Sequence, residues 1–483
     1  MNYKIMGRFC AQILTVEWIF MIPALILSIY DGESQAVFGF GVSILIIAAV
    51  TAALFFLGRG AKTAFFAREG MVCVGISWIL MSLMGSLPFW LSGEIPKFID
   101  ALFEITSGFS TTGCSILIDI EELSRGILYW RSFSHWLGGM GVLVFLLAIA
   151  PFSRGSGYTM HLMRAESPGP SFGKLVPKLR QTAMILYIIY IGLTVADLIF
   201  LLLGGMPFFD AITTAFSTAG TGGLAIKNDS IAGYSPYIQY VCTVFMILFG
   251  VNFSCFYLII IGKIRSVFKY EELKLYFAII AFSVFFITLN VRGLFDTAEE
   301  AFRGSAFTVA SIISSTGFAI TDYDTWPAFS KGILLCISMI GACAGSTGGG
   351  LKCARLLILV KSLRRNIRQV INPQRVQVVR INESMVSEQT LANTSAFLSA
   401  YVIIIVASFM LISLDNYSMG TNFSAVLACV NNIGPGFDSV GPACNYSGFS
   451  AFSKLVLCFD MLLGRLEIFP ILILFSRSTW HHK

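Results

Sequence analysis

A short turn of small residues that ends in glycine occurs four times in this chain. Its fullest copy is 109–114, Phe-Ser-Thr-Thr-Gly-Cys, and the others lie at 217–223, 314–318 and, more loosely, 431–434. Each copy closes a stretch that begins thirteen residues before its last glycine, at positions 100, 210, 304 and 421. Four copies in register predict four structural repeats, whereas an ordinary helix-breaking loop would explain only a single copy.

The composition of these turns favours cation binding. Small hydroxyl residues before a glycine let the backbone lie extended with its carbonyl oxygens exposed, because glycine tolerates angles that a side chain forbids. The candidate metal-binding residues are Thr111, Thr112, Gly113, Thr221, Gly222, Gly223, Ser315, Thr316, Gly317, Asn432, Ile433 and Gly434. The fourth copy departs from the Thr-x-Gly pattern, so Gly436 is an alternative to Gly434 as its aligned glycine.

The chain is too apolar for a soluble globule. It is 56% hydrophobic and only 12% charged, with a mean hydropathy of +0.78, whereas soluble domains are about 25% charged. Stretches of about 20 apolar residues cross a bilayer as helices, and we expect ten of them. They are 11–30, 38–57, 71–92, 129–150, 182–204, 237–262, 273–291, 331–360, 390–413 and 452–476. The predicted fold class is an all-α polytopic membrane protein.

The order of elements predicts a central pore. The amphipathic segment 101–110 is too short to cross, and non-helical backbone at membrane depth survives only inside protein or along a watery cavity. The sequence span, short helix, turn, span recurs, so four parallel helix–pore loop–helix repeats should close around an axis along the membrane normal. We predict an accessory N-terminal helix pair at 1–70 and pore repeats at 71–181, 182–272, 273–389, with a broken second helix, and 390–483.

Charge distribution predicts the orientation. Basic residues gather on alternate connections, at 4–68, 154–180, 263–274 and 352–380, which the positive-inside rule makes cytoplasmic, together with both termini. The turns then open on an acidic outer face that would concentrate cations, although solvated loop charges explain those acids equally well. Helix carbonyl ends and rings of carbonyl oxygens would favour a cation, in a filter shorter than that of potassium channels.

The run 341–350, Gly-Ala-Cys-Ala-Gly-Ser-Thr-Gly-Gly-Gly, interrupts an apolar span. Each glycine costs a helix about 1 kcal/mol relative to alanine, so this span must break. A phosphate-binding loop is the rival interpretation, but Leu351 stands where lysine is required and no strand precedes the run. Close helix packing through small residues is another.

Arg465 lies within the last predicted span. A charge at the bilayer centre costs at least about 2.5 kcal/mol, so the side chain should face a cavity or a partner, and an ion pair with Asp460 or Glu467 is the structural alternative. The basic run 361–368 is explained either by lipid headgroups or by docking of a cytosolic partner. No nucleic-acid partner is predicted.

Several of these motifs resemble the TrkH/TrkG family of bacterial potassium uptake proteins, in the superfamily that includes KtrB and the plant HKT transporters. They are 130–141 (Trp-Arg-Ser-Phe-Ser-His-Trp-Leu-Gly-Gly-Met-Gly), Phe-Ser-Thr at 216–218, the run 341–350, and 431–436 (Asn-Asn-Ile-Gly-Pro-Gly). The resemblance covers essentially the whole chain. It implies transport of K+, a location in the bacterial plasma (inner) membrane, and a homodimer with one pore per subunit. It also implies regulation by a cytosolic nucleotide-binding ring of TrkA type.

The resemblance also assigns a gate beneath the filter. It implies that an intramembrane loop closes the pore there and that an arginine below the filter projects into the path of the ion. The corresponding residues are Gly345, Ser346, Thr347, Gly348, Gly349, Gly350 and Arg465.

The sequence leaves two rival functions open. A proton- or sodium-coupled symporter with alternating access needs intramembrane acids, for which Asp460, Glu467 and Glu17 are the candidates. An intramembrane serine hydrolase would use Ser110 or Ser346 with His135. One histidine cannot serve four equivalent turns, so we predict no enzyme, and we expect His135 to be a hydrogen-bonded helix residue.

Overall fold

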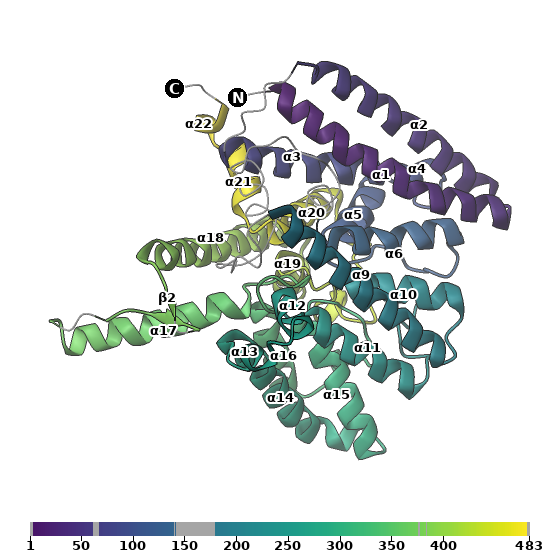
Figure 1. Cartoon of the computed structure of the whole chain (residues 1–483). Coiled ribbons are helices and arrows are strands. Elements are labelled where there is room, and N and C mark those ends of the chain that lie inside the picture. Colours follow the sequence, from purple (N-terminus) through teal and green to yellow (C-terminus); the bar gives the residue numbers. More distant parts are fainter. Residues whose placement is uncertain are drawn as a thin grey trace.

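The computed structural model describes residues 3–60, 67–139, 141, 179–374, 377–382 and 384–480, almost all of them in helices or their connections (Figure 1). The strands in this part are β1 (Arg380–Ile381) and β2 (Ser384–Met385), which pair antiparallel. The predicted all-α membrane fold, with four repeats and an N-terminal helix pair, is confirmed.

Two long helices form the N-terminal pair along one side of the molecule. They are α1 (Tyr3–Asp31) and α2 (Ser34–Leu57), drawn in purple in Figure 1. The connection between them is very short, and Gly32 there has a φ of +75°, a conformation that glycine adopts without strain. The two helices therefore run antiparallel as a hairpin.

The remaining helices follow the same order four times. The first unit holds α3 (Ala67–Gly85), α4 (Leu87–Leu91), α5 (Phe98–Phe109) and α6 (Arg125–Gly139). The second holds α9 (Leu179–Leu203), α10 (Phe208–Gly220), α11 (Pro236–Phe249), α12 (Phe253–Ile260) and α13 (Ile264–Val267). The third holds α14 (Glu271–Val291), η1 (Arg292–Leu294), α15 (Ala298–Ile313), η2 (Tyr323–Thr325), α16 (Ala328–Ile340) and α17 (Cys353–Ile371). The fourth holds α18 (Glu388–Ile412), η3 (Ser413–Asp415), α19 (Met419–Val430), η4 (Asp438–Val440), α20 (Ala451–Arg465), α21 (Phe469–Phe475) and α22 (Arg477–Trp480).

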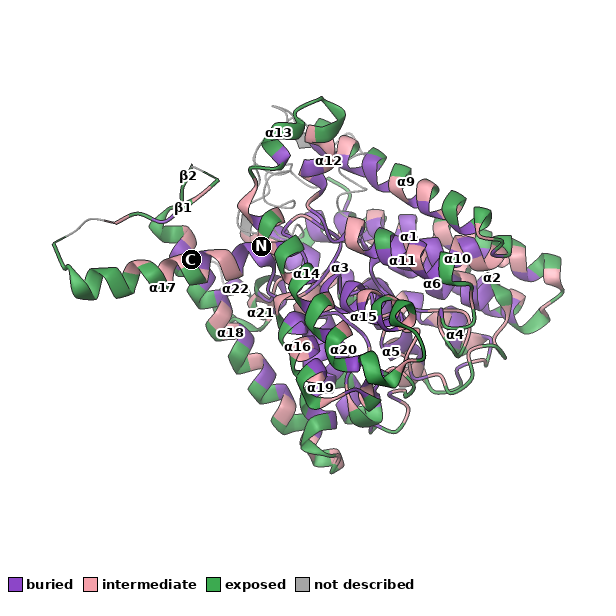
Figure 2. Ribbon diagram, turned by 90° about the horizontal axis from the view of Figure 1, so that it is seen from below, coloured by how far each residue is buried: buried purple, intermediate pink, exposed green. Residues whose placement is uncertain are grey.

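The short helices α5, α10, α15 and α19 lie in the interior, where Figure 2 shows buried residues in purple. Their small polar side chains are compatible with burial because they bond back to their own helix, as Thr218 Oγ1 does to the Thr214 carbonyl at 2.8 Å. Their starts are capped by side chains in two cases, including a capping box at Thr297 and Glu300 on α15. Each short helix is thus stable inside the protein without crossing the membrane.

The number of continuous spans is smaller than predicted. In the described part of the chain, six helices are long and apolar enough to cross a membrane, or seven if α11 and α12, bent by 93°, count as one. The expectation of continuous helices over 237–262 and 452–476 is wrong, because both spans break. The predicted break in 331–360 is confirmed, since the helix ends at Ile340 and a new one begins at Cys353. Most of the basic segment 154–180 and the end of the predicted span 129–150 lie outside the described residues.

The broken helices satisfy one another's backbone groups. The carbonyl of Gly250, at the α11–α12 break, accepts the Cys343 N–H at 3.0 Å, and the Phe253 N–H donates to the Gly345 carbonyl at 3.0 Å. Asn252 caps the new helix by accepting the Ser254 N–H at 2.9 Å. Non-helical backbone is tolerated at this depth because protein partners replace water, and these bonds tie the second unit to the third.

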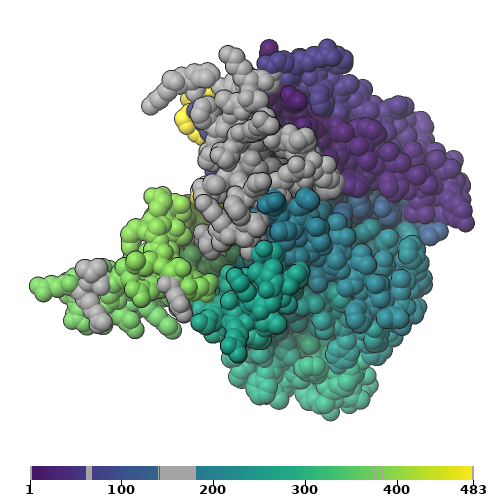
Figure 3. Space-filling model, in the orientation of Figure 1, coloured from purple at the N-terminus to yellow at the C-terminus, as the bar shows by residue number. Residues whose placement is uncertain are grey.

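One helix projects from the body of the molecule. The far end of α17, with the β1–β2 hairpin beside it, extends away from the helical bundle in Figures 1 and 3 and is largely exposed in Figure 2. Both described ends of the chain lie on this same side, where Arg68 at the start of α3 donates to the Thr479 carbonyl on α22. The basic run 361–368 lies on α17.

We predict that Gly39→Val lowers the thermal stability of the protein. A side chain at Gly39 would meet the Pro88 carbonyl oxygen and the Ser92 nitrogen at 2.9 Å, where α2 packs on α4, and overpacking of this kind costs about 1–3 kcal/mol. Gly41, on the same helix, has no atom within 4 Å of its Cβ position, so Gly41→Val is the control. The measurement is the melting temperature of each variant in detergent. Equal melting temperatures of the two variants would contradict this packing.

Candidate functional site

The four turns adopt one backbone conformation. The first residue of each turn has a left-handed φ, and so does the glycine two positions later. The first residues are Thr111 (+56°), Thr221 (+53°), Ser315 (+57°) and Asn432 (+53°), and the glycines are Gly113 (+86°), Gly223 (+69°), Gly317 (+86°) and Gly434 (+97°). Left-handed angles at non-glycine residues are costly and persist where the surroundings enforce them. The fourth turn therefore matches the others through Gly434 rather than Gly436.

The turns meet in a closed ring. A methyl group on Gly113 would collide with the Gly222 carbonyl oxygen, one on Gly223 with that of Thr316, and one on Gly317 with that of Ile433. The ring closes because a methyl group on Gly434 would lie 2.8 Å from the Thr112 carbonyl oxygen. The glycine of each unit thus lies against the middle residue of the next, in the order one, two, three, four.

The centre of this ring is narrow. The same methyl position on Gly113 lies 3.6 Å from the Thr316 carbonyl oxygen of the third unit, which is not its neighbour along the ring. Main-chain oxygens of the second and third units, Gly222 and Thr316, therefore both lie within 4 Å of one point on the first unit.

The carbonyl oxygens of the ring are short of hydrogen-bond donors. Of the twelve turn residues named from the sequence, only Gly434 has a carbonyl that accepts a hydrogen bond from a described residue, from Tyr446 Oη at 2.8 Å and Cys114 Sγ at 3.2 Å. Buried carbonyl groups are nearly always paired. A cluster of buried acceptors without donors is the chemistry of a site for a dehydrated cation.

Hydrogen bonds between side-chain hydroxyl groups stabilise the turns. Ser110 and Thr112 bond to each other at 2.6 Å, and Ser314 and Thr316 repeat this pair at 2.7 Å in the third unit. In the fourth unit Asn432 takes over, since its amide donates to Thr112 Oγ1 and to the Met461 carbonyl, both at 2.9 Å. Asn432, the residue that breaks the Thr-x-Gly pattern in the fourth copy, therefore links the fourth turn to the first.

A cavity leads to the ring from the side of the loops that follow the turns. Its volume is about 210 Å³, and Gly113, Gly223, Gly317 and Gly434 all line it. Asn228 also lines it and donates to Asp119 at 2.8 Å. This bond, with one from the Glu121 backbone, lowers the pKa of Asp119, which therefore stays negative at the entrance and attracts cations.

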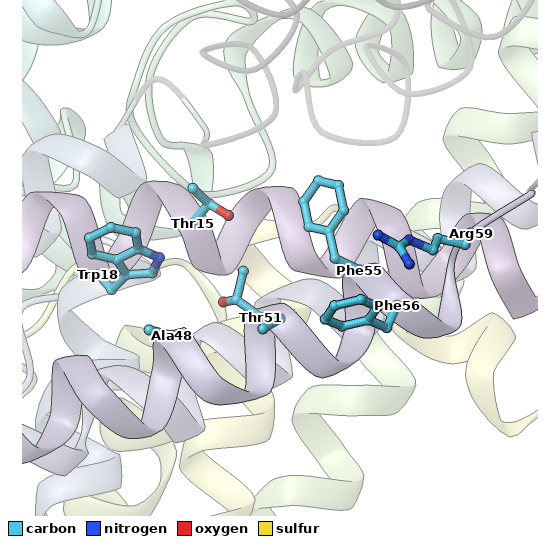
Figure 4. A pocket seen from close by; sticks show the side chains of 8 residues that line it. Thr15, Trp18, Ala48, Thr51, Phe55, Phe56 and Arg59 are labelled. Carbon is cyan, nitrogen blue, oxygen red and sulfur yellow. The ribbon is translucent and has the colours of Figure 1, made fainter.

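A second cavity, of about 370 Å³, lies between α1 and α2 (Figure 4). Trp18, Phe55 and Phe56 contribute apolar walls, and Arg59 lies at one end. This lining holds no carboxylate and one positive charge, so the cavity is unsuited to a cation. The candidate ion site is the ring.

On its other side the ring is covered by the segment 341–352, called here the inner loop. The Gly349 N–H donates to Ser315 Oγ at 2.6 Å. A methyl group on Gly348 would lie 2.6 Å from the Ser314 carbonyl oxygen, and one on Gly349 would collide with that of Asn431. The loop therefore lies in contact with the third and fourth turns, at a distance that only glycine permits.

Two charged residues that are not among the site residues predicted from the sequence hold the inner loop. Glu272 on α14 accepts the Ala344 N–H at 2.5 Å, and Lys352 donates to the Gly348 carbonyl. Both side chains are almost completely buried. The sequence signal that could have identified these two residues is a charge next to the end of an apolar span. Such a charge is common at helix ends and does not indicate contact with a loop.

Arg465 lies at the junction of the inner loop and the first unit. Its guanidinium donates to Thr111 Oγ1 at 3.1 Å, to the Thr347 carbonyl at 2.8 Å, and to the carbonyls of Gly138 and Gly139. The acids named as alternative partners are engaged elsewhere: Glu467 with Arg355 at 2.5 Å and Asp460 with Ser408 at 2.7 Å. The positive charge thus lies directly beneath the ring.

The residues of the hydrolase hypothesis do not form a catalytic arrangement. Ser110 bonds to Thr112, and Ser346 donates to the Cys343 carbonyl at 2.7 Å. His135 is buried with its ring against Gly222, where a methyl group would collide with it, and neither ring nitrogen bonds to either serine. No nucleophile and base are paired among these residues.

Comparison with known proteins identifies relatives along almost the whole chain. A family model, TrkH, described as a cation transport protein, matches residues 34–481. The chain is 34% identical over 469 residues, 95% of each chain, to the Trk system potassium uptake protein TrkH of Salmonella typhimurium. It is 31% identical to TrkG of Escherichia coli over 99% of each chain. The crystal structure of the potassium transporter TrkH from Vibrio parahaemolyticus superimposes with a TM-score of 0.89 over 100% of both chains, at 28% identity.

We predict that an alkali cation stabilises the protein through the ring. Ligand at a hundred times its dissociation constant adds about 2.7 kcal/mol to stability, so rubidium chloride should raise the melting temperature relative to choline chloride at equal ionic strength. Gly223→Ala should abolish this shift, because its methyl group collides with the Thr316 carbonyl. Gly192→Ala, with no atom within 4 Å, should retain it. An equal shift in both variants would place the cation elsewhere.

Proposed function

We propose that this chain, which belongs to the TrkH family of cation transport proteins, takes up potassium ions across the bacterial inner membrane. The relatives at 31–34% identity are named Trk potassium uptake proteins, and they are transporters rather than enzymes. The observation that carries the proposal is the closed ring of four turns whose carbonyl oxygens, apart from that of Gly434, lack donors from the described residues.

The ring acts as the selectivity filter. A potassium ion that enters from the cavity loses its water and is coordinated by main-chain oxygens from the four units. The carboxyl ends of α5, α10, α15 and α19 immediately precede the turns, and their partial negative charges lower the cost of removing water from the cation. These main-chain oxygens form what is called here the cage. Selectivity for K+ follows from the size of the cage and from the number of its oxygen ligands.

The inner loop acts as the gate. It lies in contact with the Ser314 and Asn431 carbonyls directly beneath the ring, so an ion that leaves the filter meets it first. Its glycines at 345 and 348–350 allow the backbone to move, and Arg465, bonded to the Thr347 carbonyl, adds a positive charge that opposes cation flow. Opening therefore requires the loop to move away from the turns.

The exposed end of α17 is the proposed contact for a regulatory partner. It carries Arg364, Arg365 and Arg368 beside exposed apolar residues such as Leu363 and Ile367, and it follows the inner loop directly in the chain. A cytosolic nucleotide-binding ring of TrkA type that binds this end would act on the gate through one helix. In this proposal the chain is a homodimer with lipid around it and with both termini in the cytoplasm.

A pore accounts for Asp460 and Glu467 better than a proton- or sodium-coupled symporter does. Asp460 and Glu467 are bonded to Ser408 and Arg355, so they hold helices together at these positions rather than facing the cavity at the ring. A stoichiometry in liposomes that changes with pH would favour the symporter.

Gly113→Ser should weaken the preference for potassium over sodium. The added side chain collides with the Gly222 carbonyl and distorts the cage. Fluxes of K+, Na+, Rb+ and Cs+ in reconstituted liposomes measure the preference, with Gly192→Ser as a control in open space. Unchanged discrimination in a folded Gly113→Ser protein would contradict the filter assignment.

Deletion of 345–349 should raise the open-state flux, because it removes the part of the inner loop that contacts the turns. The measurement is K+ flux per reconstituted protein, with elution volume and melting temperature as tests of folding. A deletion variant that folds and conducts like the unmodified chain would show that the inner loop is not a gate.

A further inference from the structure

An ion pair lies buried beside the first turn. Arg131 on α6 bonds to Glu104 on α5 at 2.6 Å, and only 2% and 0% of the two side chains are exposed. Burial of two charges is costly unless their remaining hydrogen-bonding groups are also satisfied. The partners of this pair therefore indicate what it stabilises.

The carboxylate of Glu104 holds the segment that leaves the first turn. Glu104 Oε2 accepts the Ile116 N–H at 3.0 Å, and Ser115 Oγ donates to both carboxylate oxygens, at 3.0 and 3.1 Å. Ser115 is two residues beyond Gly113. The segment after Gly113 is thereby attached to the short helix that precedes it.

The guanidinium of Arg131 joins this segment to the second unit. One nitrogen donates to Ser115 Oγ at 3.2 Å, and another donates to the carbonyl of Ala225. Ala225 is two residues beyond Gly223, so the two held residues occupy equivalent positions in neighbouring units. Arginine suits this task because its planar fork presents several donors in fixed directions.

The Arg131–Glu104 pair with its bonds to the segments after the turns, called here the brace, is present on one side of the ring only. The positions equivalent to Glu104, nine residues before each glycine, hold Thr214, Thr308 and Ala425. The fourth unit reaches the same segment differently, because the Tyr446 N–H donates to the Ser115 carbonyl at 2.9 Å and its hydroxyl donates to the Gly434 carbonyl at 2.8 Å. Ser115 thus connects the fourth, first and second units.

We propose that Arg131 and Glu104 are positioning residues that set the spacing of the first and second turns and so the ion selectivity of the ring. This inference rests on the proposed function. The pair acts through the segments after the turns and contacts no ion, and its effect is to keep the cage from adapting to ions of other sizes. Without it, the two turns relax and the cage also accepts Na+.

The test compares K+ and Na+ fluxes of reconstituted variants. Glu104→Gln and Arg131→Lys should each lower the K+ to Na+ flux ratio at least about fivefold, since each weakens hydrogen bonds to a charged group. The double variant that exchanges the two residues restores opposite charges but not the bonds to Ser115 and Ala225, so it should not restore the ratio. Ser115→Ala, a smaller change, should lower the ratio and keeps the test open if the charged variants do not fold.

The matched control is a second ion pair on the same short helix. Lys454 on α20 bonds to Asp100 on α5 at 2.6 Å, with 6% and 18% of the side chains exposed, and within the described ranges neither side chain bonds to a turn. Asp100→Asn and Lys454→Met should leave the flux ratio unchanged, whatever they do to stability.

Two results would overturn the inference: folded Glu104→Gln and Ser115→Ala proteins with the unmodified ratio, or an equal loss of selectivity in the Asp100 and Lys454 variants. Failure of the proposed function is distinguishable, because the unmodified protein would then show no K+ flux. If Gly113→Ser alters the ratio and the brace variants do not, the filter stands and the brace is wrong.

Discussion

The structure depends on one constraint: main-chain carbonyl groups inside a membrane protein need partners. Four short helices end at the same place, and the residues after them adopt left-handed angles that prevent the helices from continuing. Their carbonyl oxygens then face one another with few donors among the described residues. The unsatisfied acceptors are concentrated at one point, where a desolvated cation is the natural partner.

The same constraint explains the interruptions in the long helices. A break frees backbone groups, and here the groups freed in the second unit pair with those freed in the third, through Gly250 with Cys343 and Phe253 with Gly345. The inner loop is therefore part of the scaffold beneath the ring as well as a cover for it. A movement of this loop would have to break these bonds.

Backbone symmetry and side-chain asymmetry coexist around the ring. The four turns share their φ angles, yet their supports differ: Arg131 and Glu104 for the first and second units, Asn432 and Tyr446 for the fourth. Coordination by carbonyl oxygens needs only the shared backbone, so each unit is free to keep its own supporting side chains. Positive charge below the ring comes from two of the four units, through Arg465 of the fourth and Lys352 of the third.

Sequence alone determined the membrane class, the four repeats and the residues of the first three turns, because hydropathy and the spacing of small residues are local properties of the chain. The choice of Gly434 over Gly436 in the fourth turn came only from the φ angles of the structure. The sequence also predicted the break at 341–350, since a run of glycines is unstable as a helix wherever it lies. Tertiary structure decided the bend between Phe249 and Phe253, the order in which the ring closes, and the partners of Arg131, Arg465 and Glu272. The bend, the ring order and these partners depend on contacts between residues up to several hundred positions apart. A charged residue within an apolar span needs a partner, but the sequence does not show which residue the fold supplies.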